Sequence, residues 1–477
     1  MIKTRFAPSP TGYLHVGGLR TALYNYLYAK KTGGTFVLRI EDTDQSRKVE
    51  GAVENLLHTF DRIGIQFNEG PNQGGDNGPY FQSQRLDIYK KHIDDLILSG
   101  NAYPCFCDAE RLKNIRQKRL ADKLNTPYDR QCLSLSRDEA MTRMNSEPHI
   151  VRLKSPEDED IIFYDIVRDK VSIKSNDLDD QVILKTDGYP TYHLANVVDD
   201  HLMGISHVIR GEEWLSSTPK HVLLYRFLGW SPPKFAHLPL LLNPDKSKLS
   251  KRQGDVAVED FLDKGFLAET MLNFVALLGW NPGNDKEIFS LNNLEKEFSI
   301  KRIQKSGAVF DQDKLNWMNG QYLKNEPLED VCKKAEFVFN SENIDISDND
   351  KFRNIVDYAR KRVDTLNELP NEARMFYSDL EFNDEDGKML SLASSHSVFQ
   401  FWLNELDTQN YWNAEDLKSL LKRTTEETGV KGKELYSPLR LAIYGSEHGP
   451  DMPTLFNLLD LDTIKLRLRN SLEIHTG

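Results

Sequence analysis

Cysteines and long apolar runs are scarce in this sequence. Four of its 477 residues are cysteine, which is too few for the disulfide scaffold of a secreted protein. Glycine (28) and proline (20) fall well short of the level of a low-complexity chain. No run of about 18 apolar residues occurs, and residues 1–6 begin as a strand, so neither a membrane helix nor a signal peptide is expected. These absences favour a cytoplasmic enzyme that is not bound to a membrane.

The composition is that of a folded protein with several domains. At roughly 150 residues per domain, the length predicts about three of them. Lysine and arginine number 61 against 73 aspartate and glutamate, which gives a formal charge of −12. An acidic average ordinarily disfavours a nucleic-acid partner, but such a partner needs only local basic faces. Three basic segments could form them: 111–119 (Arg111, Lys113, Arg116, Lys118 and Arg119), 246–252 and 360–362.

Strand-like and helical patterns alternate in the first half of the chain. Residues 3–7 and 35–40 resemble short buried strands, and apolar residues at helical spacing between them predict a helix over 18–31. Further strands are expected at 182–184, 207–209 and 238–242. This alternation is typical of a parallel α/β sheet. The polar stretch 101–180 interrupts it and is expected to be an insertion between two halves of one sheet.

Helical periodicity dominates beyond about residue 255, where the strands are expected to end. Helices are predicted at 260–279, 329–340, 351–366 and 414–428, and acidic, loop-like stretches at 343–350 and 382–387 separate some of them. We therefore predict four parts. They are a split sheet domain (1–100 and 181–254), the insertion (101–180) and two helical regions (255–327 and 328–477).

A polar motif, PSPTGYLHVGG at residues 8–18, lies between the first predicted strand and the first predicted helix. A helix N-terminus at the carboxyl end of a strand is suited to bind phosphate. Gly17 and Gly18 lack a Cβ, so a purine ring could lie against the backbone, and His15 could place an imidazole N–H near an α-phosphate. Alternatively, the motif is a turn that only connects the strand to the helix.

A second polar motif, NPDKSKLSKR at residues 243–252, follows the last predicted strand. Its lysines could stabilise charge on phosphate oxygens during displacement at phosphorus. The alternative is a solvated basic surface loop.

Together the two motifs resemble the paired signature of class I aminoacyl-tRNA synthetases. Further segments are similar to bacterial glutamyl-tRNA synthetases, densely from residue 1 to about 325 and more thinly to the end. These segments are 5–12, 39–44, 188–200, 210–214 and 310–320. Gly18 stands where the broader class has histidine, and Leu249 and Arg252 stand where it has methionine and serine. Both variants are familiar in this subfamily.

The resemblance implies a glutamate–tRNA ligase. Its architecture would be a Rossmann-like catalytic domain with an inserted acceptor-binding domain, followed by helical stem-contact and anticodon-binding regions. The enzyme would activate L-glutamate with ATP and Mg²⁺ to glutamyl-adenylate and transfer it to the 3′ end of glutamate tRNA, acting as a monomer. A non-discriminating enzyme that also charges glutamine tRNA is the nearest alternative. A catalytically silent tRNA-binding module is disfavoured by the intact motifs.

The resemblance also implies roles for single residues. The glutamate site would contain Arg5, Ala7, Ser9, Glu41, Tyr192, Asn196 and Arg210, with Arg5 and Tyr192 on the side-chain carboxylate, Ser9 and Glu41 on the ammonium, and Asn196 and Arg210 on the α-carboxylate. The nucleotide site would contain the catalytic His15, Lys248 and Lys251 together with Gly17, Gly18, Glu213, Leu241 and Ser250. An arginine fork suits an anionic side chain, and mispaired polar groups can reject a near-isostere such as glutamine by roughly 10⁴-fold.

Two further sets of residues carry weaker expectations. Arg360 and Arg362 are candidates for anticodon contact, and the sequence does not choose between them or exclude a solvated helix face. Cys105, Cys107 and Cys132 resemble a zinc-binding insertion of some family members, in which a histidine would replace Ser134. Because serine is a poor zinc ligand, two alternatives stay open. Either water or another side chain completes a structural zinc site, or the three cysteines are reduced and metal-free.

Overall fold

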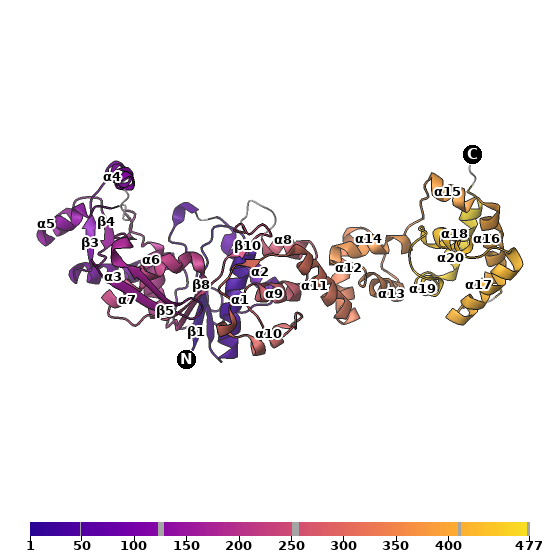
Figure 1. Cartoon of the computed structure of the whole chain (residues 1–477), viewed down its shortest axis with the longest axis horizontal. Helices are drawn as coiled ribbons and strands as arrows, with labels where there is room; N and C mark the ends of the chain where they lie inside the picture. The colour runs from indigo at the N-terminus through magenta and orange to yellow at the C-terminus, as the bar shows by residue number, and fades with distance from the viewer. Residues whose placement is uncertain (48, 123–127, 250–256, 409–411, 475–477) are drawn as a thin grey trace. The chain divides into compact units, whose positions relative to one another are not determined.

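The computed structural model describes residues 1–47, 49–122, 128–249, 257–408 and 412–474 (Figure 1). The chain forms two compact units. Unit 1 comprises Met1–Asp263 and Ala268–Leu315, and unit 2 comprises Lys264–Leu267 and Asn316–Gly477. Within the described part of the chain, no helix is long and apolar enough to cross a membrane.

Unit 1 begins with a strand, a helix and a second strand. β1 (Lys3–Phe6) and β2 (Thr35–Leu38) pair in parallel, and α1 (Val16–Lys31) connects them. Leu19, Leu23 and Leu27 recur at helical spacing and are fully buried, so this face of α1 packs into the core. The predicted alternation of strand and helix is thus confirmed for this part, with α1 beginning two residues earlier than the pattern indicated.

A four-stranded sheet in the order β6-β5-β9-β8 forms another part of unit 1. β8 (His207–Gly211) and β9 (Lys234–Leu238) run parallel, and α7 (Thr218–Phe227) connects them. The single strand predicted at 238–242 is wrong. β9 ends at Leu238, directly before Pro239, because proline has no N–H to donate to a strand ladder.

Leu241 and Leu242 form a separate short strand. This strand, β10 (Leu241–Leu242), pairs in parallel with β11 (Ala308–Val309). Strands therefore occur beyond residue 255, contrary to the prediction.

The region 101–180 shares its sheets with strands outside it. Its strands are β3 (Ala102–Cys105), β4 (Ile150–Leu153), β5 (Asp160–Asp165) and β6 (Asp169–Lys174). β4 pairs with β7 (Val182–Leu184), and β5 pairs in parallel with β9. The insertion therefore contributes β5 and β6 to the same sheet as β8 and β9. The division of unit 1 into smaller domains stays a prediction.

Helices cover these sheets. The others of unit 1 are α2 (Ala52–Ile63), α3 (Leu86–Leu98), α4 (Ala109–Ala121), α5 (Arg137–Met144), α6 (Tyr192–Leu202), α8 (Val258–Asp263), α9 (Ala268–Leu277) and α10 (Leu291–Glu297). The helix predicted at 260–279 is split into α8 and α9. Gly265, between them, has a φ of +88°, a left-handed conformation that ends a helix.

Unit 2 is helical, as predicted for the last third of the chain. After α11 (Gln312–Asn325), its helices are α12 (Leu328–Ser341), α13 (Asn349–Ala359), α14 (Leu369–Ala373), α15 (Asp384–Leu390), α16 (Ala393–Leu406), α17 (Ala414–Thr428), α18 (Lys433–Tyr444), α19 (Met452–Leu458) and α20 (Leu461–Leu472). Fully buried Phe339, Phe399 and Trp402 lie in its core.

In unit 2 two helix boundaries differ from the predictions, one at the end of a helix and one at the start of another. The helix expected at 351–366 ends at Ala359. The acidic stretch 382–387 is the start of α15 rather than a loop, because Asn383 and Asp386 form a reciprocal capping box.

Candidate active site

A cavity of about 610 Å³ opens in unit 1, where β1 and β8 end beside the N-terminus of α1. Every substrate-binding residue predicted within the described part of the chain lines it. These residues are Arg5, Ala7, Ser9, His15, Gly17, Gly18, Glu41, Tyr192, Asn196, Arg210, Glu213, Leu241 and Lys248. Ser250 and Lys251 lie outside the described residues. The fold thus brings together residues from five distant segments of the sequence.

His15 sits at the start of α1 and caps it. Its Nδ1 accepts a hydrogen bond from the backbone N–H of Gly18 at 3.1 Å, so a neutral His15 carries its ring proton on Nε2. The glycines keep this arrangement open, since a Cβ on Gly17 would lie 3.1 Å from His15 Nδ1 and 3.6 Å from Leu241 Cδ1. Gly17 therefore lies between the imidazole of His15 and Leu241, which comes two residues before the second motif.

Lys248 lies on a turn that follows β10. Leu249 donates its backbone N–H to the carbonyl of Leu241, and Asn243 donates its backbone N–H to the carbonyl of Ser247, which folds the segment back on itself. Ala257, the first described residue after the gap, pairs with His15. Lys248 in the cavity lining and Ala257 in its pairing with His15 therefore both lie close to the first motif.

Arg5 is held by a buried carboxylate. Its Nε and Nη2 donate to the two oxygens of Asp200 at 3.0 and 3.2 Å, and Arg39 Nη1 donates to the same carboxylate at 2.8 Å. Burial opposes ionisation of Asp200, but the two guanidinium groups outweigh it and hold its pKa below the usual value. Asp200 is therefore an anion that fixes the orientation of Arg5 at the cavity wall.

Glu41 and Asn196 complete this part of the cavity. Arg39 Nη2 donates to Glu41 Oε1 at 3.1 Å. With its amide oriented to satisfy its neighbours, Asn196 donates to Asp200 at 3.2 Å and accepts from Arg5 and Arg39, both at 3.3 Å. Burial raises the pKa of Glu41 despite these arginines, so an ammonium group placed beside it would gain a partner for its charge.

Arg210 and Tyr192 also line the cavity. Arg210 Nη1 donates to Tyr192 Oη at 3.0 Å, and the Tyr192 ring packs on Trp214 with 4.1 Å between ring centroids. Burial raises the pKa of Tyr192, which therefore stays protonated. The cavity lining thus contains the guanidinium groups of Arg5 and Arg210 and the carboxylate of Glu41, a set of charges suited to an amino acid with an anionic side chain.

Models of known families match almost the whole chain. A model described as "tRNA synthetases class I (E and Q), catalytic domain" matches residues 1–317, and one described as "Anticodon binding domain" matches residues 326–472. The chain belongs to the class I tRNA synthetases of the glutamate and glutamine group. The resemblance inferred from the sequence motifs is confirmed.

Relatives of this synthetase have the same length and fold. It is 44% identical to the glutamate–tRNA ligase of Alkaliphilus metalliredigens and 45% identical to that of Clostridioides difficile, in each case over 98% of both chains. A solved glutamate tRNA ligase from Elizabethkingia meningosepticum, in complex with its amino acid, superposes with a TM-score of 0.92 at 36% identity and covers 99% of each chain.

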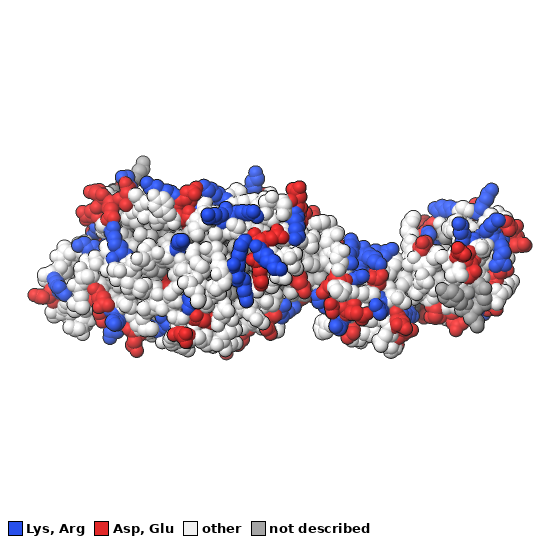
Figure 2. Space-filling view, turned by 90° about the horizontal axis from the view of Figure 1, so that it is seen from below, with Lys and Arg blue, Asp and Glu red and all other residues white. Residues whose placement is uncertain are grey.

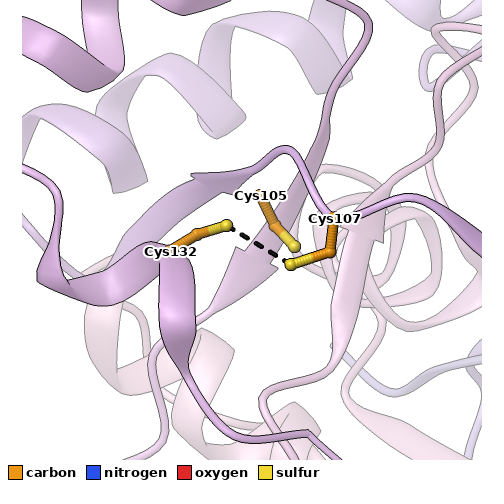
Figure 3. Close-up of side chains that lie close together, drawn as sticks. All are labelled: Cys105, Cys107 and Cys132. Atoms are coloured by element: carbon orange, nitrogen blue, oxygen red, sulfur yellow. Dashed lines mark hydrogen bonds between the residues drawn. The ribbon is translucent and has the colours of Figure 1, made fainter. Parts of the chain in front are cut away.

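The synthetase also carries a cluster of three cysteines in unit 1, shown in Figure 3. The sulfur atoms of Cys105, Cys107 and Cys132 all lie within 4.8 Å of one another, and Cys107 Sγ is 3.5 Å from Cys132 Sγ. Ser134 does not take part, because its hydroxyl donates to the carbonyl of Gln131. Instead the Tyr128 hydroxyl lies 3.3 Å from Cys105 Sγ and 3.6 Å from Cys107 Sγ. The cluster can hold a metal ion, and sequence reasoning missed Tyr128.

The two arginines of unit 2 that were predicted to contact the anticodon differ in exposure and in hydrogen bonding. Arg360 is 11% exposed, and its guanidinium donates to Asp357 and to the carbonyls of Leu323 and Glu326. Arg362 is 42% exposed and stacks on the Tyr358 ring at 3.7 Å. Arg360 therefore supports the fold, whereas Arg362 presents its charge to solvent.

Charges of both signs are distributed over the surface. On the face drawn in Figure 2, basic and acidic side chains are interspersed on both units. The basic segment 111–119 lies on α4, a helix without a buried residue, where Lys113, Arg116 and Lys118 are exposed. A net charge of −12 therefore coexists with a local basic face.

Proposed function

We propose that the cavity of unit 1 activates L-glutamate with ATP and that the chain transfers it to the 3′ end of a glutamate tRNA. The observation that carries this proposal is the convergence of both nucleotide motifs and the charged glutamate residues on one cavity. The α-carboxylate of glutamate attacks the α-phosphorus in line, which forms glutamyl-adenylate and releases pyrophosphate. A hydroxyl of the terminal adenosine of the tRNA then attacks the activated carbonyl, which breaks the bond to the phosphate and releases AMP.

The glutamate end of the cavity is rich in hydrogen-bond donors. Arg5 donates to Asp200 through Nε and Nη2. Its Nη1 is directed, together with the Tyr192 hydroxyl, to the side-chain carboxylate of the substrate glutamate. Ser9 and Glu41 bind the ammonium, and Asn196 and Arg210 lie at the α-carboxylate. A glutamine amide would present an NH₂ group to these donors, which favours glutamate.

The nucleotide part of the proposed site combines glycines with cations. Adenine lies on Gly17 and Gly18 near Leu241 and Glu213, and the Nε2 proton of His15 faces the phosphates. Lys248, which is exposed at the cavity rim, and Lys251 stabilise the charge that builds up on the phosphate oxygens. Mg²⁺ enters with ATP.

ATP–pyrophosphate exchange tests this function. We expect exchange with glutamate in the presence of tRNA, and none with glutamine or without tRNA. Robust exchange with glutamine would overturn the substrate assignment. Charging assays with purified glutamine tRNA then separate the discriminating enzyme from the non-discriminating alternative, which would glutamylate that tRNA as well.

Anticodon contact is assigned to Arg362, because its charge is exposed. Arg362→Ala should raise the KM for tRNA roughly tenfold, the value of one good base contact, while the KM for glutamate stays unchanged. Lys361→Ala is the control, since Lys361 is 52% exposed and pairs with Asp357 at 2.7 Å, whereas Arg362 is 42% exposed and lies 3.8 Å from Glu372. An equal effect of the two substitutions would show that the segment contributes only general charge.

The cysteine cluster is assigned to zinc, with the Tyr128 oxygen as the fourth donor. The three sulfur atoms lie within 4.8 Å of one another, and thiolate sulfur is a preferred zinc ligand. Hydrogen bonds from Cys132, Tyr128 and Arg152 lower the pKa of the Cys105 thiol, while the bond with Cys105 raises the pKa of Cys132 and burial raises that of Tyr128, so Cys105 is the first of these groups to lose its proton. Metal analysis of the purified chain should find about one zinc per molecule.

Tyr128→Phe tests the fourth donor of that cluster. The substitution keeps the ring that packs against Arg152, and it should lower zinc affinity roughly tenfold in a competition with a chromogenic chelator. Ser134→Ala, which removes a hydroxyl outside the cluster, should leave the affinity unchanged. Zinc far below one per chain would instead indicate three reduced, metal-free cysteines.

A further inference from the structure

Arg210 lies on the cavity wall, yet most of its N–H groups point away from the cavity. Nε donates to His237 Nε2 at 3.1 Å, and Nη2 donates to Thr218 Oγ1 at 2.7 Å and to His221 Nδ1 at 3.2 Å. These partners are almost completely buried behind the wall. With the bond to Tyr192, four of the five arginine N–H groups have partners within the described part of the chain, so one Nη1 hydrogen is left for a ligand.

Asp165 determines which nitrogen of His237 accepts from Arg210. Asp165 Oδ2 lies 2.6 Å from His237 Nδ1, so this nitrogen carries the ring proton. Burial lowers the pKa of His237 and keeps the ring neutral, which leaves Nε2 as an acceptor for Arg210. Asp165 is on β5 and His237 is on β9, and both are inaccessible to solvent or nearly so. The pairing of an insertion strand with the β8–β9 sheet thus creates this contact.

The orientation of Arg210 in turn determines what Tyr192 can do. The Tyr192 oxygen accepts from Arg210 Nη1, so its own proton is directed to a different acceptor. A carboxylate oxygen of a ligand accepts such a proton, whereas an amide NH₂ group cannot. This wall therefore presents N–H and O–H donors to the ligand.

We propose that Asp165 and His237 are positioning residues for substrate glutamate, which act by holding the Arg210 guanidinium in the orientation in which Nη1 donates to Tyr192, so that the Tyr192 hydroxyl donates to the ligand. The inference rests on the proposed function, in which Arg210 and Tyr192 contact glutamate. Asp165 and His237 themselves do not touch the substrate. They contribute to the selection of glutamate over glutamine from behind the cavity wall.

The substitution Asp165→Asn separates this role from packing. Asp165 Oδ1 accepts from three backbone N–H groups, those of Val167, Arg168 and His237. The amide oxygen of asparagine must take that position, so its NH₂ group faces His237 Nδ1. His237 then has to carry its proton on Nε2, where Thr218 Oγ1 can accept it at 3.1 Å. Arg210 Nε loses its acceptor although the size and shape of the side chain are unchanged.

We expect Asp165→Asn to raise the KM for glutamate roughly tenfold and to reduce the preference for glutamate over glutamine by a similar factor, since one hydrogen bond to a charged group is lost. The KM for ATP should be unchanged, because the nucleotide motifs lie at the other end of the cavity. Asp160→Asn, the same substitution at an exposed position of β5, is the control and should have no effect.

The ring proton of His237 can be observed directly. Nitrogen NMR of protein labelled at histidine, assigned with His237→Gln, should show an Nδ1–H tautomer in the wild type and an Nε2–H tautomer in Asp165→Asn. An Nε2–H tautomer in the wild type would overturn the proposal without any variant.

Arg210→Lys distinguishes a failure of the proposed function from a failure of the positioning role. If it leaves the KM for glutamate unchanged, the substrate assignment of Arg210 fails. If it raises that KM while Asp165→Asn does not, the positioning role alone fails.

Discussion

Arg5→Lys is expected to lower kcat/KM for glutamate by about 10²-fold or more while leaving the KM for ATP near its wild-type value. Arg5 uses Nε and Nη2 on Asp200 and still has Nη1 for the substrate carboxylate. A lysine ammonium is a single charged point, so it cannot bind both carboxylates in these positions. Initial rates of ATP–pyrophosphate exchange against glutamate concentration measure the effect.

Arg85→Lys is the matched control for this substitution. Arg85 is buried in the same network, and its Nε donates to Asp199 at 2.7 Å, but it does not line the cavity. Both variants should be less stable than the wild type, because each loses part of a buried ion pair. Only the Arg5 variant should have an altered KM for glutamate. Similar KM values for the two would assign Arg5 to folding instead of substrate binding.

The residues of the cavity could be predicted from the sequence because they lie in contiguous motifs. His15, Gly17 and Gly18 belong to one loop, and Tyr192 and Asn196 belong to the start of one helix. The types of residue within each motif are enough to indicate the kind of ligand that it binds. The parallel alternation of strands and helices likewise follows from local periodicity, which is strong in α1 and β1.

The supporting residues could not be predicted, because their partners are distant in the sequence. Asp200 follows an apolar helix face, and nothing local indicates that Arg5 and Arg39 converge on it from two strands. Asp165 meets His237 only because β5 pairs with β9, which joins the insertion to the sheet. Such contacts depend on strand order, which periodicity leaves undetermined.

The interruption of a strand and of a helix within apolar runs is a second difference from the predictions, and each interruption has a visible cause. Pro239 and Gly265 lie within the apolar runs that were assigned to one strand and one helix. Proline removes a ladder donor, and glycine at φ +88° ends the helix, so each run is divided. The apolar pattern indicates burial correctly in both places, but it does not indicate continuity of the backbone.

His15→Asn should lower the rate of glutamyl-adenylate formation by about 10²- to 10³-fold with little change in stability, since it removes one donor to the developing charge. His15 has two separable roles. Its Nδ1 caps α1 through the Gly18 N–H, and in the proposed function its Nε2 proton faces the phosphates. Asparagine is a favourable N-cap residue, so its oxygen can accept from Gly18 while the imidazole proton is lost.

His15→Ala provides the comparison, because it removes the cap as well as the proton. Its melting temperature should fall by an amount that corresponds to about 1 kcal/mol, whereas that of His15→Asn should not. The two variants should form adenylate equally slowly in single-turnover assays with saturating ATP. A wild-type rate in His15→Asn would show that His15 acts only as a helix cap, and the phosphate chemistry would then depend on the lysines of the second motif.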